Sequence, residues 1–286
     1  MFSRIAAFGG VYNNYLALEA ALHDIRRRGA DAVFCLGDLG AFGPHPDRVF
    51  PLLHDYGVLC IQGNYDNSVG NGLADCQCGY TDPRDNHFAR ISYEYTFSRT
   101  SPANRDWLRG LPAQRRVQLG RHRVLMCHGS PRRVNEFLWE STTPTHFLDH
   151  LATAHDADVI LATHTGIKWH RPLTPVPLPH GGRGVFVPPP PVGEGNRGEG
   201  ASRHFVNVGV LGRPENDGRT CVWYTLLEAG PEFRVEFVPV EYDHHRLARE
   251  MREERLPEEF IETVLTGWWT TCLEVLPGKE RRRGRW

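Results

Sequence analysis

Four short polar motifs contain residue types that suit metal chemistry. They are Gly37-Asp38, Gly63-Asn64-Tyr65-Asp66, His128-Gly129-Ser130-Pro131 and Thr163-His164-Thr165-Gly166. Each motif follows a short apolar run, so one carboxylate, one amide oxygen and two imidazoles are expected at strand ends. Such mixed oxygen and nitrogen ligands suit Zn, Mn or Fe. Singly, each motif is typical of a turn or of a hydrogen-bonded strand end, but four in succession favour a metal site.

The elements that would position these motifs follow the rhythm of a parallel sheet. Apolar runs predict strands over residues 4–8, 32–36, 58–61, 124–127 and 159–161. Periodic segments predict helices over residues 16–28, 46–56, 85–97, 102–110 and 145–154. Open α/β sheets place their ligands at the carboxyl ends of the strands, so the four motifs are expected to meet there.

The C-terminal part is predicted to form a second sheet. Runs over residues 205–210, 221–227 and 233–240 are spaced by turn residues, which is typical of an antiparallel meander. Two more helices are predicted over residues 243–255 and 257–266. Between the two parts, 15 of the 31 residues in segment 171–201 are Pro or Gly, which predicts a long loop or flap beside the site.

The order of the four motifs resembles that of the calcineurin-like metallophosphoesterase superfamily, in its compact bacterial and archaeal phosphodiesterase branch. Flanking segments agree, with LALEAAL at 16–22, GPHPDRV at 43–49 and VNVGVLGRPENDG at 206–218. The resemblance covers residues 3–240. It implies an α/β fold in which two sheets pack as an αββα sandwich. We therefore expect a metallophosphoesterase-like domain over residues 1–240, with its insertion at 171–201, and a C-terminal helical extension with a basic tail over 241–286.

Three ligand positions of the family carry other residues in this chain. The family opens with an Asp-x-His motif at the end of its first strand, where this sequence has Gly10 and Tyr12. Its last motif reads Gly-His-Thr-His, where this sequence ends in Gly166. In the family these three positions serve one metal of a pair, so the resemblance implies that this metal is not bound.

The ligands of the other metal are complete. In the family the residue matching Asp38 bridges both ions, and those matching Asn64, His128 and His164 hold the retained one. We therefore expect a mononuclear site for one divalent transition metal ion, Mn, Fe or Zn. One such ion can still lower the pKa of a bound water or polarise a phosphoryl oxygen.

Four further residues are expected to act near the ion. Tyr65 stands where the family often has a His that contacts phosphate. The alternative role for Tyr65 is that of a packed aromatic side chain whose hydroxyl is hydrogen-bonded within the protein. Asp66 is expected to orient the loop. Arg132 and Arg133 follow the third motif and match phosphate oxygens in bidentate fashion. Simple solvent exposure is the alternative for both arginines.

Other cysteines and histidines offer substitute ligands. Cys76 and Cys78, with His87 nearby, could supply soft ligands, a redox pair or only small buried side chains. His170 and His204 flank the insertion and could refill the position at Gly166, or serve as ordinary loop residues. The odd total of seven Cys in a chain of 286 residues predicts reduced thiols. The other five are expected in the core, at positions 35, 60, 127, 221 and 272.

Composition limits the partners. Lys and Arg number 33 against 34 Asp and Glu, a net charge of −1, so no overall field attracts nucleic acid or anionic membranes. No apolar run approaches the roughly 18 residues that a membrane span requires, and the start lacks a secretory apolar segment. We expect a cytoplasmic protein without membrane or nucleic-acid partners. A homo-oligomer is left open, and the basic tail at 279–286 is expected to be solvated.

These observations predict a hydrolase, namely a metal-dependent phosphoesterase acting on a phosphate-containing small molecule. Two alternatives stay open. One is a non-catalytic member of the same fold that binds a phosphate ligand or a protein, and the other is a mononuclear metalloenzyme of another reaction class. The retained ligands favour an enzyme, whereas the missing Asp-x-His motif weakens the case for phosphate hydrolysis.

Overall fold

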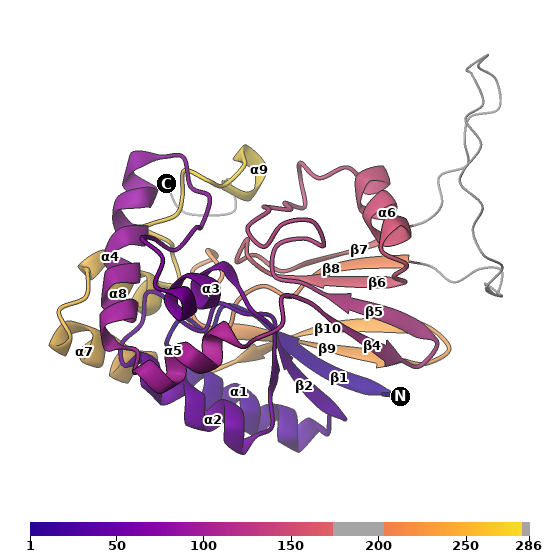
Figure 1. Ribbon diagram of the computed structural model, residues 1–286, viewed down its shortest axis with the longest axis horizontal. Coiled ribbons are helices and arrows are strands. Elements are labelled where there is room, and N and C mark those ends of the chain that lie inside the picture. Colours follow the sequence, from indigo (N-terminus) through magenta and orange to yellow (C-terminus); the bar gives the residue numbers. More distant parts are fainter. Residues whose placement is uncertain (174–202, 282–286) are drawn as a thin grey trace, which may run out of the picture.

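The computed structural model describes residues 1–173 and 203–281, and it arranges them around two β-sheets packed face to face (Figure 1). Within these residues each sheet has five strands, in the orders β10-β9-β1-β2-β3 and β4-β5-β6-β8-β7. The strands are β1 (Arg4–Phe8), β2 (Ala32–Cys35), β3 (Leu59–Cys60), β4 (Arg115–Leu119), β5 (His122–Met126), β6 (Val159–Ala162), β7 (Trp169–Leu173), β8 (Arg203–Asn207), β9 (Val222–Ala229) and β10 (Phe233–Val240).

The first sheet is built around β1, which pairs parallel with β2 and antiparallel with β9. Successive side chains of a strand point to opposite faces. Accordingly, Ile5 and Ala7 face the second sheet, while Ala6 and Phe8 face the helices. The second sheet has β5, β6 and β8 parallel to one another, with antiparallel strands at both edges.

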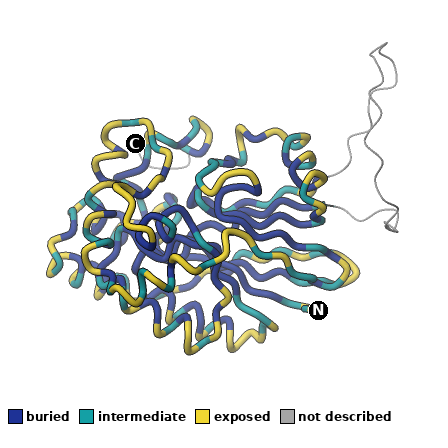
Figure 2. The backbone as a smooth tube through the Cα atoms, viewed as in Figure 1, coloured by how far each residue is buried: buried dark blue, intermediate teal, exposed yellow. Residues whose placement is uncertain are grey.

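Helices cover the outer face of each sheet. They are α1 (Tyr15–Arg28), the 3-10 turn η1 (Pro46–Arg48), α2 (Val49–Asp55), α3 (Asn64–Asn71), α4 (Pro83–Arg99), α5 (Pro102–Arg109), α6 (Thr145–Ala154), α7 (His244–Glu253), α8 (Glu258–Thr266) and α9 (Gly278–Arg281). Side chains of α1, α2, α4, α7 and α8 share one core with the outer face of the first sheet. Leu148 and Leu151 of α6 pack on the second sheet. Figure 2 shows the strands mostly buried between these layers, which confirms the αββα sandwich.

The predicted meander of three C-terminal strands is wrong. β8 lies in the second sheet, where Val206 pairs with Leu161 of β6 in parallel. β9 and β10 instead form a hairpin in the first sheet, next to β1. The spacing of turn residues indicates where strands end. It does not indicate which strands pair, because pairing depends on packing between segments that are far apart in the sequence. The edge strands β4 and β7 were also not predicted.

The structure bears on the start of the predicted insertion but does not test the predicted domain boundary. Residues 171–173 of the predicted flap are the end of β7, and residues 174–202 lie outside the described part of the chain. Leu247 and Phe260 of the C-terminal helices lie in the core that also contains β1. The division at residue 240 stays a prediction. Among the described helices, we find none with the length and apolarity needed to span a membrane.

Candidate metal centre

Asp38 stands in a tight turn that directly follows β2. Its backbone is left-handed, with a φ of 59°, a conformation that costs a non-glycine residue about 1–3 kcal/mol. The buried carboxylate of Asp66 stabilises this turn, because it accepts the backbone N–H groups of Asp38 (2.7 Å), Leu39 (2.9 Å) and Gly63 (2.8 Å). Asp66 thereby connects the loop after β2 to the start of α3.

Asn64 is the first residue of α3 and is 1% exposed. Its neighbours on both sides contact Asp38. A Cβ added to Gly63 would lie 2.3 Å from Asp38 Oδ1, so only glycine permits this approach, and the N–H of Tyr65 donates to the same oxygen at 3.0 Å. The amide nitrogen of Asn64 donates to the carbonyl of Cys76 at 2.8 Å, while its Oδ1 has no hydrogen-bond partner among the described residues. A buried acceptor without a donor suits a cation.

His128 follows β5 and is 1% exposed. Its Nδ1 lies 2.7 Å from the carbonyl oxygen of Leu36 and donates to it, because a carbonyl can only accept. This bond fixes the ring orientation and leaves Nε2 toward the cluster, as is usual for metal-ligating histidines. Nε2 lies 3.2 Å from Asp38 Oδ2 and 3.2 Å from His164 Nδ1.

His164 follows β6 in a left-handed conformation, with a φ of 51°. Its Nε2 is buried, and the ring of Phe137 lies 4.4 Å from the imidazole between centroids. Asp38 and His164 thus both occupy sparsely populated backbone conformations beside one another. Such strain gathers at functional sites because the surrounding structure must maintain it.

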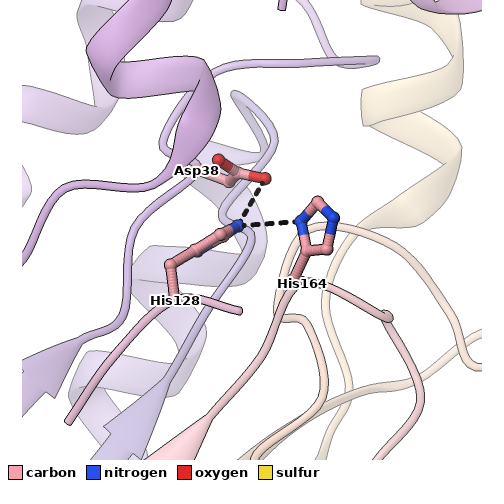
Figure 3. Close-up of side chains that lie close together, drawn as sticks. All are labelled: Asp38, His128 and His164. Atoms are coloured by element: carbon pink, nitrogen blue, oxygen red, sulfur yellow. Dashed lines mark hydrogen bonds and ion pairs between the residues drawn. The ribbon is translucent and has the colours of Figure 1, made fainter. Parts of the chain in front are cut away.

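The three side chains converge from different sheets (Figure 3). Candidate ligand atoms of Asp38, His128 and His164 lie within 4.8 Å of one another. Burial raises the pKa of Asp38, but the charge of His128 and its hydrogen bond outweigh burial and lower it. Burial lowers the pKa of His128, yet the charge of Asp38 raises it overall. Burial, followed by the charge of His128, lowers the pKa of His164 to about 3.

These residues fit a divalent transition metal ion. His128 Nε2 lies 3.2 Å from Asp38 Oδ2 and from His164 Nδ1, so the three donor atoms lie close together. An ion binds these donors only in their deprotonated forms, so its binding should weaken as pH falls. The donors Asp38, Asn64, His128 and His164 are the oxygen and nitrogen mixture expected for Mn, Fe or Zn.

The cavity at this centre is small. Its free space is about 10 Å³, comparable to the space that one water molecule occupies. Burial raises the pKa of both Tyr12 and Tyr65, so the phenols at its wall stay neutral. The lining residues are Tyr12, Asp38, Phe42, Tyr65, Cys78, Tyr80, Ala89 and His164.

The glycines that stand at two of the family's other ligand positions have closely packed neighbours. A Cβ on Gly10 would lie 2.5 Å from Val210 Cγ1, and one on Gly166 would lie 3.0 Å from the indole of Trp269. Both glycines have positive φ values, 49° and 78°. Tyr12 is 6% exposed and lines the cavity. Restoring the family ligands at these positions would therefore require displacement of Val210 and Trp269.

Tyr65 and Arg132 have partners of their own, and Arg133 is exposed. The hydroxyl of Tyr65 donates to Ser92 Oγ at 2.9 Å. Arg132 forms an ion pair with Glu136 and packs over the ring of Phe147. Arg133 is exposed, and neither arginine is among the described residues that line the cavity. Phosphate contacts by Tyr65, Arg132 and Arg133 stay predictions.

The histidines considered as substitute ligands lie elsewhere. His170 Nε2 lies 3.0 Å from His204 Nδ1. His204 pairs with Val159, three residues before the end of β6, so it lies about 10 Å along the strand from the end that leads to His164. It therefore does not refill the position at Gly166. The ring of His87 contacts Phe88.

Cys76 and Cys78 form a disulfide, so the expectation of seven reduced thiols is wrong for this pair. The other five are buried free thiols, as expected. The structure shows the pair bonded to each other, and its role stays a prediction. Only one residue separates the two cysteines, and the fold of the loop places their sulfurs close enough to bond. The number of cysteines in the chain does not indicate which of them are close together.

The geometry agrees with the comparisons to known proteins. Residues 3–190 match the family model of the calcineurin-like phosphoesterases, and the chain belongs to this family. An uncharacterized protein of Methanocaldococcus jannaschii is 26% identical over 265 residues, which covers 93% of this chain and 98% of that protein. A metallophosphoesterase from Sphaerobacter thermophilus has a TM-score of 0.65 at 25% identity, over 93% of this chain and all of that one. A hypothetical protein from Pyrococcus horikoshii shares the fold, with a TM-score of 0.69 at 19% identity over 93% and 99% of the two chains.

Sequence reasoning missed several residues that enclose the centre. Tyr80 lines the cavity, Phe137 covers His164, and Trp269 stacks on Arg213 with the guanidinium carbon 3.5 Å from the ring centroid. All of them lie outside regular elements, so no periodicity marks them. Arg213 could have been noticed, because it ends the segment VNVGVLGR that resembles the family.

Proposed function

We propose that this protein is a metal-dependent phosphoesterase that uses one divalent transition metal ion. Asp38, Asn64, His128 and His164 are the proposed ligands, and the substrate class is a phosphate ester of a small molecule. The proposal rests most on one observation: the donor atoms of Asp38, His128 and His164 lie within 4.8 Å of one another. Asn64, whose neighbour Tyr65 donates to Asp38, adds a buried oxygen that has no partner among the described residues.

The filled second position supports a mononuclear site. Val210 and Trp269 occupy the space next to Gly10 and Gly166, where the family places ligands of its other ion. Loss of ligands alone would leave a polar space, whereas here apolar side chains fill it. A single ion is therefore the arrangement that this packing favours.

Each residue has a defined task in this proposal. When bound, the ion supplies Lewis acidity toward a phosphoryl oxygen and a water. Leu36 holds the proton on His128 Nδ1, and Asp66 holds the turn of Asp38. Tyr65 would contact the phosphoryl group only after its hydroxyl leaves Ser92. Arg132 would first leave Glu136, and the exposed Arg133 could approach directly.

The small cavity favours a second candidate function. Space of about 10 Å³ admits an ion or a water but no phosphate group, so a substrate would require movement of the surrounding loops. If these loops stay closed, the ion stabilises the fold, and the protein is a non-catalytic binding member of its family.

Metal content and hydrolysis test both candidates. Purified protein should contain one Mn, Fe or Zn per chain by elemental analysis, and it should hydrolyse an activated aryl phosphate monoester or diester. His128→Ala should lose the ion and at least 100-fold in rate. His150→Ala, at an exposed histidine of α6, serves as the control and should keep both.

The outcomes separate the candidates. Two ions at full occupancy would refute the mononuclear site. One bound ion without metal-dependent turnover against either ester would refute the phosphoesterase and leave the binding member. Turnover of the diester but not the monoester would identify a phosphodiesterase.

A further inference from the structure

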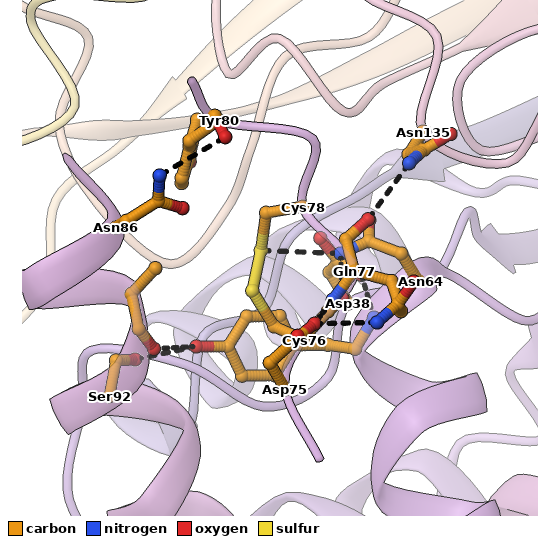
Figure 4. Close-up of a disulfide and its surroundings, with 12 residues drawn as sticks. Asp38, Asn64, Asp75, Cys76, Gln77, Cys78, Tyr80, Asn86, Ser92 and Asn135 are labelled. Carbon is orange, nitrogen blue, oxygen red and sulfur yellow. Dashed lines mark hydrogen bonds between the residues drawn. A yellow bond between two sulfur atoms is a disulfide. The ribbon is translucent and has the colours of Figure 1, made fainter. Parts of the chain in front are cut away.

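The disulfide between Cys76 and Cys78 lies in the loop that joins α3 to α4 (Figure 4). The single residue between the cysteines, Gln77, has a left-handed φ of 53°. Its N–H donates to Asp75 Oδ1 at 2.8 Å, and its carbonyl accepts from Asn135 at 2.9 Å. Both backbone polar groups of Gln77 are therefore hydrogen-bonded. The bond from Asn135 connects this loop to the segment that follows His128.

The loop forms a wall between the metal cavity and an open groove. The groove has a volume of about 510 Å³, and both cysteines line it. Cys78 also lines the cavity that contains Asp38 and His164, and Tyr80 and Ala89 line both spaces as well. A small thiol reagent in the groove would thus meet the disulfide without passing through the metal centre.

Cys78 lies against two of the proposed metal ligands. Its Sγ accepts from the amide nitrogen of Asn64 at 3.4 Å, and Cys78 lines the same cavity as His164. The Oδ1 of Asn64, on the other side of the same amide, has no partner among the described residues. The sulfur is therefore next to the ligand shell, but the bond to Cys76 keeps it from acting as a ligand.

We propose that two-electron reduction of the Cys76–Cys78 disulfide frees Cys78 to join Asp38, His128 and His164 as a thiolate ligand of the ion. This inference rests on the metal site of the proposed function. It makes the affinity for metal depend on the oxidation state of the pair.

The step balances with a dithiol as the reductant. The S–S bond breaks, each sulfur gains one electron and one proton, and the dithiol becomes a disulfide. The Cys78 S–H then loses its proton to solvent as the sulfur binds the ion. Because thiolates are soft ligands, this change should favour Zn and Co over Mn.

Cobalt provides a readout that does not depend on activity. A thiolate bound to Co²⁺ gives a charge-transfer band in the near ultraviolet, which oxygen and nitrogen ligands do not give. Full-length protein would be titrated with Co²⁺ in the oxidised form and after reduction by a dithiol that is then removed. The reduced form should show the band and bind Co²⁺ at least tenfold more tightly, and reoxidation should reverse both changes.

Two matched variants identify the sulfur. Cys76→Ser and Cys78→Ser each remove the disulfide and leave one cysteine. Cys76→Ser should show the band without reductant, and Cys78→Ser should lack it. If either variant fails to fold, as judged by circular dichroism, the reversible change in the wild-type protein still decides the question.

Three results would overturn the inference. Equal Co²⁺ affinity in both redox forms without the band would refute thiolate ligation and leave the metal site of Asp38, His128 and His164 intact. A band in Cys78→Ser but not in Cys76→Ser would assign the other sulfur. Failure of both redox forms to retain Co²⁺ would refute both the inference and the proposed function.

Discussion

The carboxylate of Asp66 accepts three backbone N–H groups from the two loops that present Asp38 and Asn64. We expect Asp66→Asn to lower the free energy of unfolding by about 2 kcal/mol, because the amide replaces an acceptor with a donor among buried donors. Metal affinity should fall as well, since the Asp38 turn loses its support. Chemical denaturation and metal titration measure the two effects.

Asp55→Asn is the control, because Asp55 is exposed at the end of α2. It should change stability by less than about 0.5 kcal/mol. Similar losses in both variants would show that Asp66 has no special positioning role.

Gly166 and Gly29 form a matched pair of left-handed glycines. Their φ values are 78° and 73°, but a Cβ on Gly29 meets nothing within 4 Å, while one on Gly166 meets Trp269 at 3.0 Å. Each Gly→Ala change should cost about 1 kcal/mol for the backbone alone. We predict a larger loss at Gly166, by thermal denaturation. Equal losses would show that the space beside Trp269 is not tightly packed.

For single residues, the position of a motif at the end of a predicted strand was enough to predict that Asp38, His128 and His164 lie close together. Parallel strands present their carboxyl ends at one edge, so motif position translates into proximity. The partners of Tyr65 and Arg132 were not predictable in this way. Ser92 and Glu136 lie on an adjacent helix and a loop, and their contacts depend on side-chain packing rather than on spacing.

Among the elements, those with strong local periodicity were predicted best. Strand β1 and helix α6 have the predicted bounds, and the helix predicted at 16–28 is observed one residue longer. The assignment of β8, β9 and β10 to one sheet failed because β8 pairs with β6 and β9 pairs with β1, and both partners lie far away in sequence. A short strand with mixed polarity, such as β7 (WHRPL), gives no alternating signal.

The segment after α8 places Trp269 against Gly166. Trp269 is 3% exposed, its indole N–H donates to the carbonyl of Pro214 at 2.7 Å, and its ring stacks on Arg213. We predict that Trp269→Ala costs about 3–5 kcal/mol, because it leaves a large cavity. Urea denaturation measures the loss.

Trp268→Ala is the neighbouring control. Trp268 is only partly buried, so its loss should cost clearly less than that of Trp269. If the two variants lose the same stability, the segment contributes through general apolar burial and not through the Trp269 contacts.

For the whole molecule, His204 makes stability depend on pH. Burial, followed by the charges of His170 and His122, lowers its pKa from 6.5 to about 4. Between these values the unfolded chain binds the proton more tightly, so the free energy of unfolding falls as pH drops through this window. We predict a contribution of about 2 kcal/mol between pH 7 and pH 4. His204→Gln should lose less stability than the wild-type protein over this range, and an unchanged pH profile would contradict the assignment.

The candidate metal ligands come from both sheets, since Asp38 follows β2 in one sheet and His128 and His164 follow β5 and β6 in the other. The complete ligand set forms only when the sheets have docked. An ion should therefore leave the folding rate unchanged and slow unfolding, because its bonds are absent from the folding transition state. Stopped-flow measurements with saturating Mn²⁺ and with a chelator should differ only in the unfolding limb. Equal unfolding rates would show that the ion is not bound across the sheets.

Whatever its role in chemistry, an ion at this place would extend the lifetime of the native protein against proteolysis that requires separation of the sheets.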